Sequence, residues 1–497
     1  MLLTEDLLLD YKRCRRRAFL EVYGDPTEKD PKSDFLLKLQ EDSRLHRQAV
    51  FAHFAYERPK YPWRDWQAAS QATLELMQRG AESIKDAVLL MPTSQGVTLL
   101  TRPDLLVKQP GQSIFGDWVY SPTIIKLGRR PKAEYKILAA FSSQILADVQ
   151  GVLPTTAELM LRRPHPYRVD LETWLPLMQE VLAECTDILL LKQEPEVFIS
   201  RQKCGLCRWH SQCYAIAQEA KHLSLLPGVT PHRYQDLQTL GLTTVESLAD
   251  SSITDFEPIL EPEIALELVQ QAQSTIQNRP LLRQEMALGT RWEDNRNGKT
   301  PQLLIPTNTI PTALVEIYFD IEAEPDLHVD YLLGVLVIDR LNQTETFYNL
   351  LAEHPREEAS IWYEFLALVE LYPDAPIFHF SDYEAETVQR LAKLYKTPRR
   401  EVKPLLRRFV DLHQQVTNHV KLPVESYSLK NLARWLGFEW RDTNVTGSQT
   451  VCLYNQWLKT GDRSLLAAVE RYNEDDCRAT YKLKDWLVSF LQNAATL

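Results

Sequence analysis

The stretch Tyr318-Phe319-Asp320-Ile321-Glu322 decides the fold of the C-terminal part, because it ends a hydrophobic run in two carboxylates. The run Ala313–Phe319 is typical of a buried β-strand, along which side chains alternate between the two faces. Asp320 and Glu322 are therefore predicted to point to the same side. Two carboxylates held close together repel each other unless a proton or a cation lies between them. Hard divalent cations take such oxygen ligands, so the stretch predicts a metal site.

A second acidic stretch, Tyr472-Asn473-Glu474-Asp475-Asp476-Cys477-Arg478, lies near the C-terminus. Residues 470–487 are predicted to form a helix, so Tyr472 and Asp476, four residues apart, share one face. Two divalent cations about 4 Å apart can activate a water and stabilise the leaving oxygen of a phosphodiester. The two acidic stretches together predict such a site, with Asp475 as the adjacent alternative to Asp476.

The elements between these stretches predict an α/β domain of the ribonuclease-H-like type. The expected strands are 313–319, 331–338, 347–350 and 376–380, and the expected helices are 357–371 and 470–487.

These motifs resemble the DEDD family of 3′–5′ exonucleases, in the subclass that carries a tyrosine. The resemblance covers residues 312–497. Asp320 and Glu322 match the first motif, and Tyr472 with Asp476 matches the third. It implies that the carboxylates hold two Mg²⁺ or Mn²⁺ ions and that the tyrosine orients the attacking water.

The second motif of that family requires an acidic residue just after a strand and at the start of a helix. Asp382 and Glu384 are both candidates. Glu384 is favoured, because Tyr383-Glu384 best resembles relatives that write this motif with a Tyr-Glu pair. Asp411 also resembles an aspartate that recurs in this type of domain.

Four of the seven cysteines have the placement of metal ligands, namely Cys14, Cys204, Cys207 and Cys213. Four thiolates satisfy a [4Fe–4S] cluster. The alternatives are Zn²⁺ bound by the last three cysteines with His210, or free buried thiols. The arrangement of one cysteine plus three resembles the iron–sulfur nucleases of the RecB family, which include CRISPR-associated exonucleases and the AddB subunit. The resemblance covers residues 1–215 and implies a restriction-endonuclease-type α/β core.

The nuclease motif of the RecB family is incomplete in this chain. His46 and Asp104 match its histidine and its first aspartate, and Lys126 matches its lysine. Ile124 stands where the family has a carboxylate, so a metal would have too few anionic ligands there. Glu134 on the following helix is a candidate for a migrated carboxylate. A retained fold that binds DNA or serves only as a scaffold is the preferred interpretation.

Other segments of the N-terminal part carry secondary-structure signals. An amphipathic helix broken by basic residues is expected over 2–22, a hairpin over 96–107, a strand over 118–127 and a helix over 134–147.

Residues 216–282 are predicted to be helical and to resemble a helix-hairpin-helix unit, whose turn presents backbone N–H groups to a phosphate. Residues 283–311, which are rich in proline and polar residues, are predicted to be a linker. The expected organisation is therefore a RecB-like domain (1–215), the helical region (216–282), the linker and a ribonuclease-H-like domain (312–497).

The composition is that of a globular chain of 497 residues, 44% hydrophobic and 25% charged, with a net charge of −11. No apolar run approaches the roughly 20 residues needed to span a bilayer. The acidic start argues against a signal peptide, so a cytoplasmic location without a membrane partner is expected. The charge argues against a general nucleic-acid coat protein, although carboxylates that hold metals contribute to it.

The combined prediction is a metal-dependent nuclease, a 3′–5′ DNA exonuclease of repair, recombination or defence. With both resemblances taken together, the chain is similar to RecB-like nucleases that are fused to a ribonuclease-H-like exonuclease domain. The alternatives are an exonuclease that processes RNA, and an adaptor that binds nucleic acid with both sites inactive.

Overall fold

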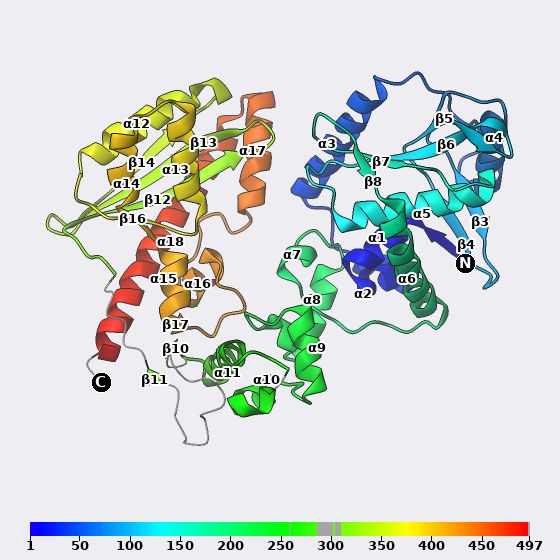
Figure 1. The fold of residues 1–497 in the computed structure, drawn as a ribbon. Coiled ribbons are helices and arrows are strands. Elements are labelled where there is room, and N and C mark those ends of the chain that lie inside the picture. Colours follow the sequence, from blue (N-terminus) through cyan, green and yellow to red (C-terminus); the bar gives the residue numbers. More distant parts are fainter. Residues whose placement is uncertain (258, 286–301, 304–309, 496–497) are drawn as a thin grey trace. The chain divides into compact units, whose positions relative to one another are not determined.

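The computed structural model describes residues 1–257, 259–285, 302–303 and 310–495, which form two compact α/β units, Met1–Ile216 and Ala217–Leu497 (Figure 1). Most of the predicted linker 283–311 lies outside the described residues. Its described part includes an antiparallel pair of two-residue strands, β10 (Gln284–Glu285) and β11 (Gln302–Leu303).

The second unit is built on a five-stranded sheet with the strand order β14-β13-β12-β15-β16. Strands β14, β13 and β12 are antiparallel to one another, whereas β12, β15 and β16 run parallel. The strands are β12 (Val315–Glu324), β13 (Val329–Asp339), β14 (Thr344–Leu351), β15 (Ile377–His379) and β16 (Phe409–Asp411).

Helices cover both faces of this sheet, as Figure 1 shows. One face packs on α12 (Glu358–Glu370), α13 (Tyr383–Leu394), α14 (Arg399–Leu406) and α17 (Gly447–Thr460). The other face packs on α15 (Leu412–His419), α16 (Leu429–Trp435) and the 33-residue α18 (Arg463–Ala495).

Alternation along β12 assigns its side chains to these two layers. Ile317, Phe319 and Ile321 are buried in the core beneath α12, whereas Tyr318 belongs to the core beneath α18. Asp320 has the same parity as Tyr318 and faces α18.

Helix α18 is attached to β12 by polar contacts at two levels. The Lys484 ammonium pairs with the Glu316 carboxylate, and both side chains are at most 1% exposed. Three turns earlier in the helix, Asn473 Nδ2 donates to Asp320 Oδ2 at 2.7 Å. The helix therefore runs antiparallel to β12 with a fixed register.

The first unit contains a five-stranded sheet with the order β2-β5-β6-β7-β8 and a three-stranded sheet with the order β1-β4-β3. Helix α5 (Ala133–Gln150) connects the parallel strands β6 and β7. The strands are β1 (Leu2–Thr4), β2 (Ser83–Lys85), β3 (Leu89–Pro92), β4 (Thr98–Thr101), β5 (Leu105–Ser113), β6 (Gly116–Ile125), β7 (Ala157–Met160) and β8 (Tyr167–Val169). The other helices are α1 (Glu5–Arg13), α2 (Arg15–Tyr23), α3 (Asp34–Phe51), α4 (Trp66–Gln78), α6 (Leu171–Leu190), α7 (Arg201–Cys204) and α8 (His210–Glu219).

Two predictions for the first unit are wrong in detail. The strands expected to form a hairpin over 96–107, β4 and β5, belong to different sheets, because the Arg102-Pro103 step interrupts the strand and proline lacks the N–H needed for pairing. The helix expected over 2–22 begins with strand β1 and is split at Cys14, whose backbone is extended at φ −159° and ψ 118°.

The helical region predicted over 216–282 contains α9 (Pro231–Thr239), α10 (Val245–Ala249) and α11 (Pro262–Gln277). The region ends in β9 (Leu281–Leu282), which pairs antiparallel with β17 (Val420–Lys421). Gln271 of α11 strengthens this junction, because its Nε2 donates to Leu422 O at 2.7 Å.

No helix in the described part of the chain combines the length and the apolar character required to cross a membrane.

Candidate metal centre

Three carboxylates converge between β12 and α18. Asp320 and Glu322 come from consecutive same-side positions of β12, and Asp476 comes from α18. One oxygen of each lies within 4.8 Å of the others, and no other group of three or more potential ligands this close is found among the described residues. This spacing suits divalent cations bound by oxygen.

Each of these carboxylates accepts a hydrogen bond from a neutral donor. Thr450 Oγ1 of α17 donates to Glu322 Oε2 at 2.6 Å, and Trp440 Nε1 donates to Asp476 Oδ1 at 2.7 Å. The third donor is the Asn473 amide, which bonds Asp320. Neutral donors orient the carboxylates without cancelling their charge, as the outer contacts of a metal site do.

The electrostatics also fit a cation. Burial raises the pKa of Asp320 well above its usual value, and the neighbouring charges of Asp476 and Glu322 add to that rise. Burial likewise raises the pKa of Glu322 to about 8 and that of Asp476 to about 7. A cation between the three groups would remove the repulsion that keeps them protonated.

The structure places Tyr472 on the same face of α18 as Asp476, with 8% of its surface exposed. Its hydroxyl is close enough to Asp476 to lower that carboxyl's pKa by hydrogen bonding. Lys430 Nζ lies 5.7 Å from the centre of the Tyr472 ring and 5.5 Å from that of Trp440. A tyrosine, an indole and an ammonium group thus border the carboxylates on one side.

The two candidates for the second motif differ in burial. Glu384, in the first turn of α13, is 4% exposed, and its charge contributes to the raised pKa of Asp320. Its Oε2 is buried without a hydrogen bond and lies 3.4 Å from His379 Nδ1. Asp382 is exposed at the N-cap of α13. A buried carboxylate oxygen without a hydrogen bond is unusual, and it makes Glu384 a better candidate for a metal ligand than the exposed Asp382.

Asp411 and Asp475 accept hydrogen bonds from neighbouring parts of the fold. Asp411 Oδ1 accepts from the backbone N–H groups of Ser381 at 3.0 Å and His413 at 2.8 Å, which holds the loop that begins α13. Both oxygens of Asp475 accept from Arg441 at 2.8 Å.

Sequence reasoning missed the three donors Thr450, Trp440 and Asn473. Only Asn473 had a visible signal, because it lies inside the acidic stretch of α18. Its approach requires Gly334 of β13, where an added Cβ would lie 1.6 Å from Asn473 Oδ1. Gly334 pairs with Asp320 on the neighbouring strand. Because glycine has no side chain, Asn473 has room to approach the Asp320 carboxylate.

In the first unit, the structure brings the four predicted cysteine ligands together. Cys14, Cys204, Cys207 and Cys213 line one small pocket, together with basic residues that include Arg16 and Lys203. The Ser200 N–H donates to Cys204 Sγ at 3.3 Å. Burial raises the pKa of the Cys207 thiol to about 11, and the charge of Arg17 opposes the rise.

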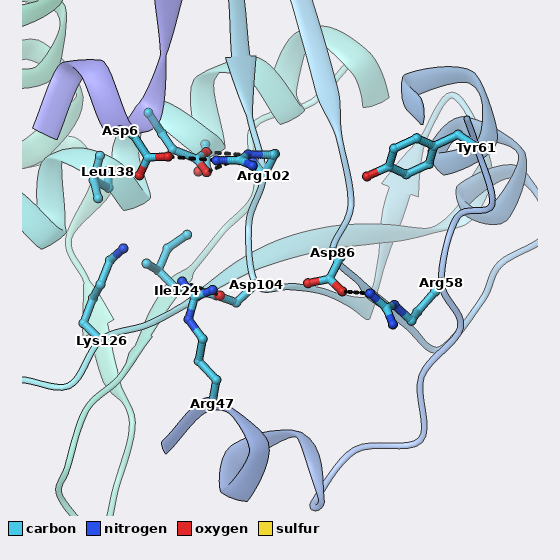
Figure 2. A pocket seen from close by; sticks show the side chains of 12 residues that line it. Asp6, Arg47, Arg58, Tyr61, Asp86, Arg102, Asp104, Ile124, Lys126 and Leu138 are labelled. Carbon is cyan, nitrogen blue, oxygen red and sulfur yellow. Dashed lines mark hydrogen bonds and ion pairs between the residues drawn. The ribbon is translucent and has the colours of Figure 1, made fainter. Parts of the chain in front are cut away.

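The residues predicted for the N-terminal nuclease motif gather at a second pocket, of about 410 Å³ (Figure 2). Asp104, Ile124 and Lys126 line it, and His46 interacts electrostatically with Asp104 beside it. Glu134 does not line this pocket and lies 3.9 Å from Arg13, so the structure does not supply the migrated carboxylate.

Comparison with protein families identifies the C-terminal domain. Residues 317–488 match the model of the RNase H superfamily. The domain is therefore RNase H-like, as the order of its elements predicts. Such domains typically use Mg²⁺ or Mn²⁺ and act on nucleic acids, which suggests a phosphodiester hydrolase of the nuclease type. No curated protein matches the chain.

Proposed function

We propose that the C-terminal RNase H-like domain is a two-metal-ion exonuclease that removes nucleotides from DNA in the 3′–5′ direction. The observation that carries this proposal is the convergence of Asp320, Glu322 and Asp476 within 4.8 Å. Three carboxylate oxygens at this spacing can bind the divalent ions that metal-assisted phosphodiester hydrolysis requires, and they lie in a domain of a nuclease superfamily.

Glu384 completes the ligand set in this proposal, because its buried Oε2 has no hydrogen-bond partner. Two divalent ions, when bound, would supply the Lewis acid that activates water and stabilises the leaving oxygen. Tyr472 would orient the attacking water. Burial raises the pKa of its hydroxyl, so the group stays protonated and donates a hydrogen bond.

The preference for DNA over RNA, the polarity and a role in repair, recombination or defence rest on the resemblance to the DEDD exonucleases and on the RecB-like character proposed for the N-terminal unit. The α9–α10 region supports a DNA-binding role as a helix-hairpin-helix-like unit.

The test uses the full chain, purified anaerobically and assayed with Mn²⁺ on end-labelled linear and closed circular DNA and RNA. Linear DNA should be degraded from its 3′ end, and Asp320→Ala should lose more than the roughly 100-fold that is typical of lost outer contacts in metal sites. Full activity of Asp320→Ala would refute the site, and cleavage of closed circles would refute the exonuclease assignment.

A matched pair of variants tests the fourth ligand. Glu384→Gln keeps the size of the side chain and removes its charge, so activity should collapse as in Asp320→Ala. Asp382→Asn makes the same change two residues earlier at an exposed position and should keep activity. The reverse ranking would transfer the ligand role to Asp382.

For the N-terminal unit we propose a RecB-like fold with a [4Fe–4S] cluster on Cys14, Cys204, Cys207 and Cys213. Their shared pocket, its basic lining and the N–H donor to Cys204 Sγ support a bound anionic cluster. Iron and acid-labile sulfide should be present in equal amounts and disappear in Cys204→Ser, but persist in Cys185→Ala. Zinc in place of iron would refute the cluster.

A further inference from the structure

The pocket of about 410 Å³ in the first unit is a second potential site, remote in sequence from the C-terminal carboxylates. Its walls come from α1, α3, α5, the end of β6, and the segments that follow β2 and precede α4 and β5. Four cationic side chains line it, namely Arg47, Arg58, Arg102 and Lys126. Figure 2 shows them arranged around one hollow, with Lys126 on one side and the Tyr61 ring on the other.

The donor set of this pocket does not fit a divalent cation. Both oxygens of Asp104 are already engaged, since Oδ1 lies 3.0 Å from the Arg47 guanidinium and Oδ2 accepts from Ile125 N at 2.6 Å. Ile124 contributes only an apolar surface. The other carboxylates that line the pocket are paired as well, because Glu5 accepts from the Arg102 N–H, and Asp6 and Asp86 accept from the Arg102 and Arg58 side chains. His46, beside the pocket, offers one buried nitrogen without a hydrogen bond. Cations of this kind require several oxygen ligands.

One cation of the pocket is available to an anion. Lys126 makes no ion pair with any residue of the described chain, and its charge acts on Asp104 only at longer range. Arg58 and Arg102 pair with Asp86 at 2.5 Å and with Asp6 at 2.8 Å. These two pairs are exposed and can open toward a ligand at small cost.

The segment Arg58-Pro59-Lys60-Tyr61-Pro62-Trp63-Arg64, which contributes Arg58 and Tyr61 to the pocket, also carries an exposed aromatic side chain. Tyr61 lines the pocket, and Trp63 is 82% exposed. The Arg64 guanidinium lies 4.1 Å from the centre of the Trp63 ring. An exposed indole covered by a guanidinium is a platform on which an unpaired base can stack.

We infer that this pocket grips a phosphodiester of single-stranded nucleic acid without a metal, while Trp63 stacks on a base next to that phosphate. Lys126 supplies the charge, and Arg58 and Arg102 add to it when they leave their exposed partners. Ile124 and the pairing of the lining carboxylates keep a cation out. The choice of nucleic acid as ligand rests on the function proposed for the C-terminal domain, whereas the binding step is independent of cleavage.

Fluorescence anisotropy of the full chain with labelled single-stranded DNA and RNA, in EDTA over a range of salt, tests the inference. Lys126→Ala should bind about tenfold more weakly, as expected for a lost contact to a charged group. Its slope of log Kd against log salt should fall by about 1. Trp63→Ala should weaken binding about 5- to 100-fold without changing that slope.

The matched control is Arg168→Ala on β8, which removes a 77% exposed cation of the same unit that lies outside the pocket. Its affinity should match that of the original chain. Equal affinities and slopes for Lys126→Ala and the original chain would overturn the inference.

A metal-binding arm tests the exclusion of cations. A variant with Asp320→Ala and Asp476→Ala should bind no Mn²⁺ by calorimetry. Mn²⁺ binding that persists there and disappears on adding Asp104→Ala would overturn the inference. If the chain binds single strands through Lys126 yet cleaves no substrate, the proposed exonuclease function fails while this inference stands.

Discussion

Thr450, Trp440 and Asn473 each hold one carboxylate of the C-terminal site, and each comes from a different part of the chain. None of the three carries a charge, so the negative charge of the cluster remains available to cations. Contacts of this kind fix ligand geometry and typically contribute 10- to 100-fold to metal affinity or activity. The donors are therefore positioning residues, which can be tested separately from the ligands.

Replacement of Thr450 by Val keeps the shape of the side chain and removes the 2.6 Å hydrogen bond to Glu322. We expect cleavage at limiting Mn²⁺ to fall about 10- to 100-fold and to recover partly at high Mn²⁺. The measurement is the rate as a function of Mn²⁺ concentration. Thr460→Val, at the exposed end of the same helix, is the control. An unchanged Mn²⁺ dependence in Thr450→Val would contradict the role.

The raised pKa values of Glu322, about 8, and Asp476, about 7, predict how the stability of the metal-free protein depends on pH. The folded state holds these protons to higher pH than the unfolded chain does, so their contribution to stability is complete below about pH 4 and is lost as pH rises to about 8.

Between pH 5 and pH 8, the melting temperature of the second unit should therefore fall in EDTA, and Mn²⁺ should raise it most at pH 8. Differential scanning calorimetry measures both effects. Asp476→Asn should flatten the fall, since an amide does not titrate. A melting temperature that rises over this range in EDTA would contradict the prediction.

At the scale of single residues, the sequence predicts the three converging carboxylates better than the donors that hydrogen-bond to them. Asp320 and Glu322 can be placed on one face because a strand has a fixed period, and Asp476 follows from helical spacing. Trp440 and Thr450 gave no signal, since their contacts depend on how α17 and the loop before it fold back onto β12. That path is set by tertiary packing and not by a local pattern.

Helix α18 illustrates the scale of whole elements. Its attachments at Asn473 and Lys484 bracket Asp476 on one side of the helix. Because both attachments reach β12, a shift of α18 along the sheet would break two buried polar contacts at once. The position of Asp476 relative to Asp320 is therefore held by the register of a helix on a strand.

Gly334→Ala tests this register. An added Cβ would meet Asn473 Oδ1 at 1.6 Å, so α18 must move or Asn473 must give up Asp320. We expect a loss of about 1–3 kcal/mol of stability, typical of overpacking, together with a large loss of cleavage. Thermal unfolding and the nuclease assay measure the two effects. Gly447→Ala, where nothing lies within 4 Å of an added Cβ, should keep its melting temperature. Equal behaviour of the two variants would contradict the prediction.

The existence of most elements could be predicted, but their pairing could not. All four strands expected in the C-terminal domain are present, whereas β16 was missed because it is only three residues long. The prediction of a hairpin over 96–107 was wrong for a different reason. Two adjacent apolar runs suggest a hairpin, but whether they pair or enter separate sheets depends on partners far away in the chain.

For the whole molecule, the two proposed cofactor sites lie in different compact units. Cys14 and Cys213 are near the two ends of the first unit, so a cluster bound there would close a loop of almost the entire unit. Cross-links of this kind stabilise mainly by restricting the unfolded chain.

Cys14→Ser should therefore lose iron and lower the melting temperature of the first unit, while Mn²⁺-dependent cleavage by the second unit persists. Iron analysis, calorimetry and the nuclease assay on the same preparation give the three readouts. Cys452→Ser is the control for thiol loss. Simultaneous loss of iron and of cleavage would show that the two units do not work separately.

The junction between β9 and β17 has a practical consequence for how the protein can be divided. Trimming the chain to the superfamily match, residues 317–488, would remove β9 and Gln271 and strip Lys421, which is 7% exposed, of its partner Glu267 at 3.4 Å. In the fragment, Lys421 would be buried without its acidic partner and the edge of β17 would be exposed. Exposed strand edges promote aggregation. A fragment that begins near residue 217 keeps that edge covered and is the better choice for expressing the RNase H-like domain without the first unit.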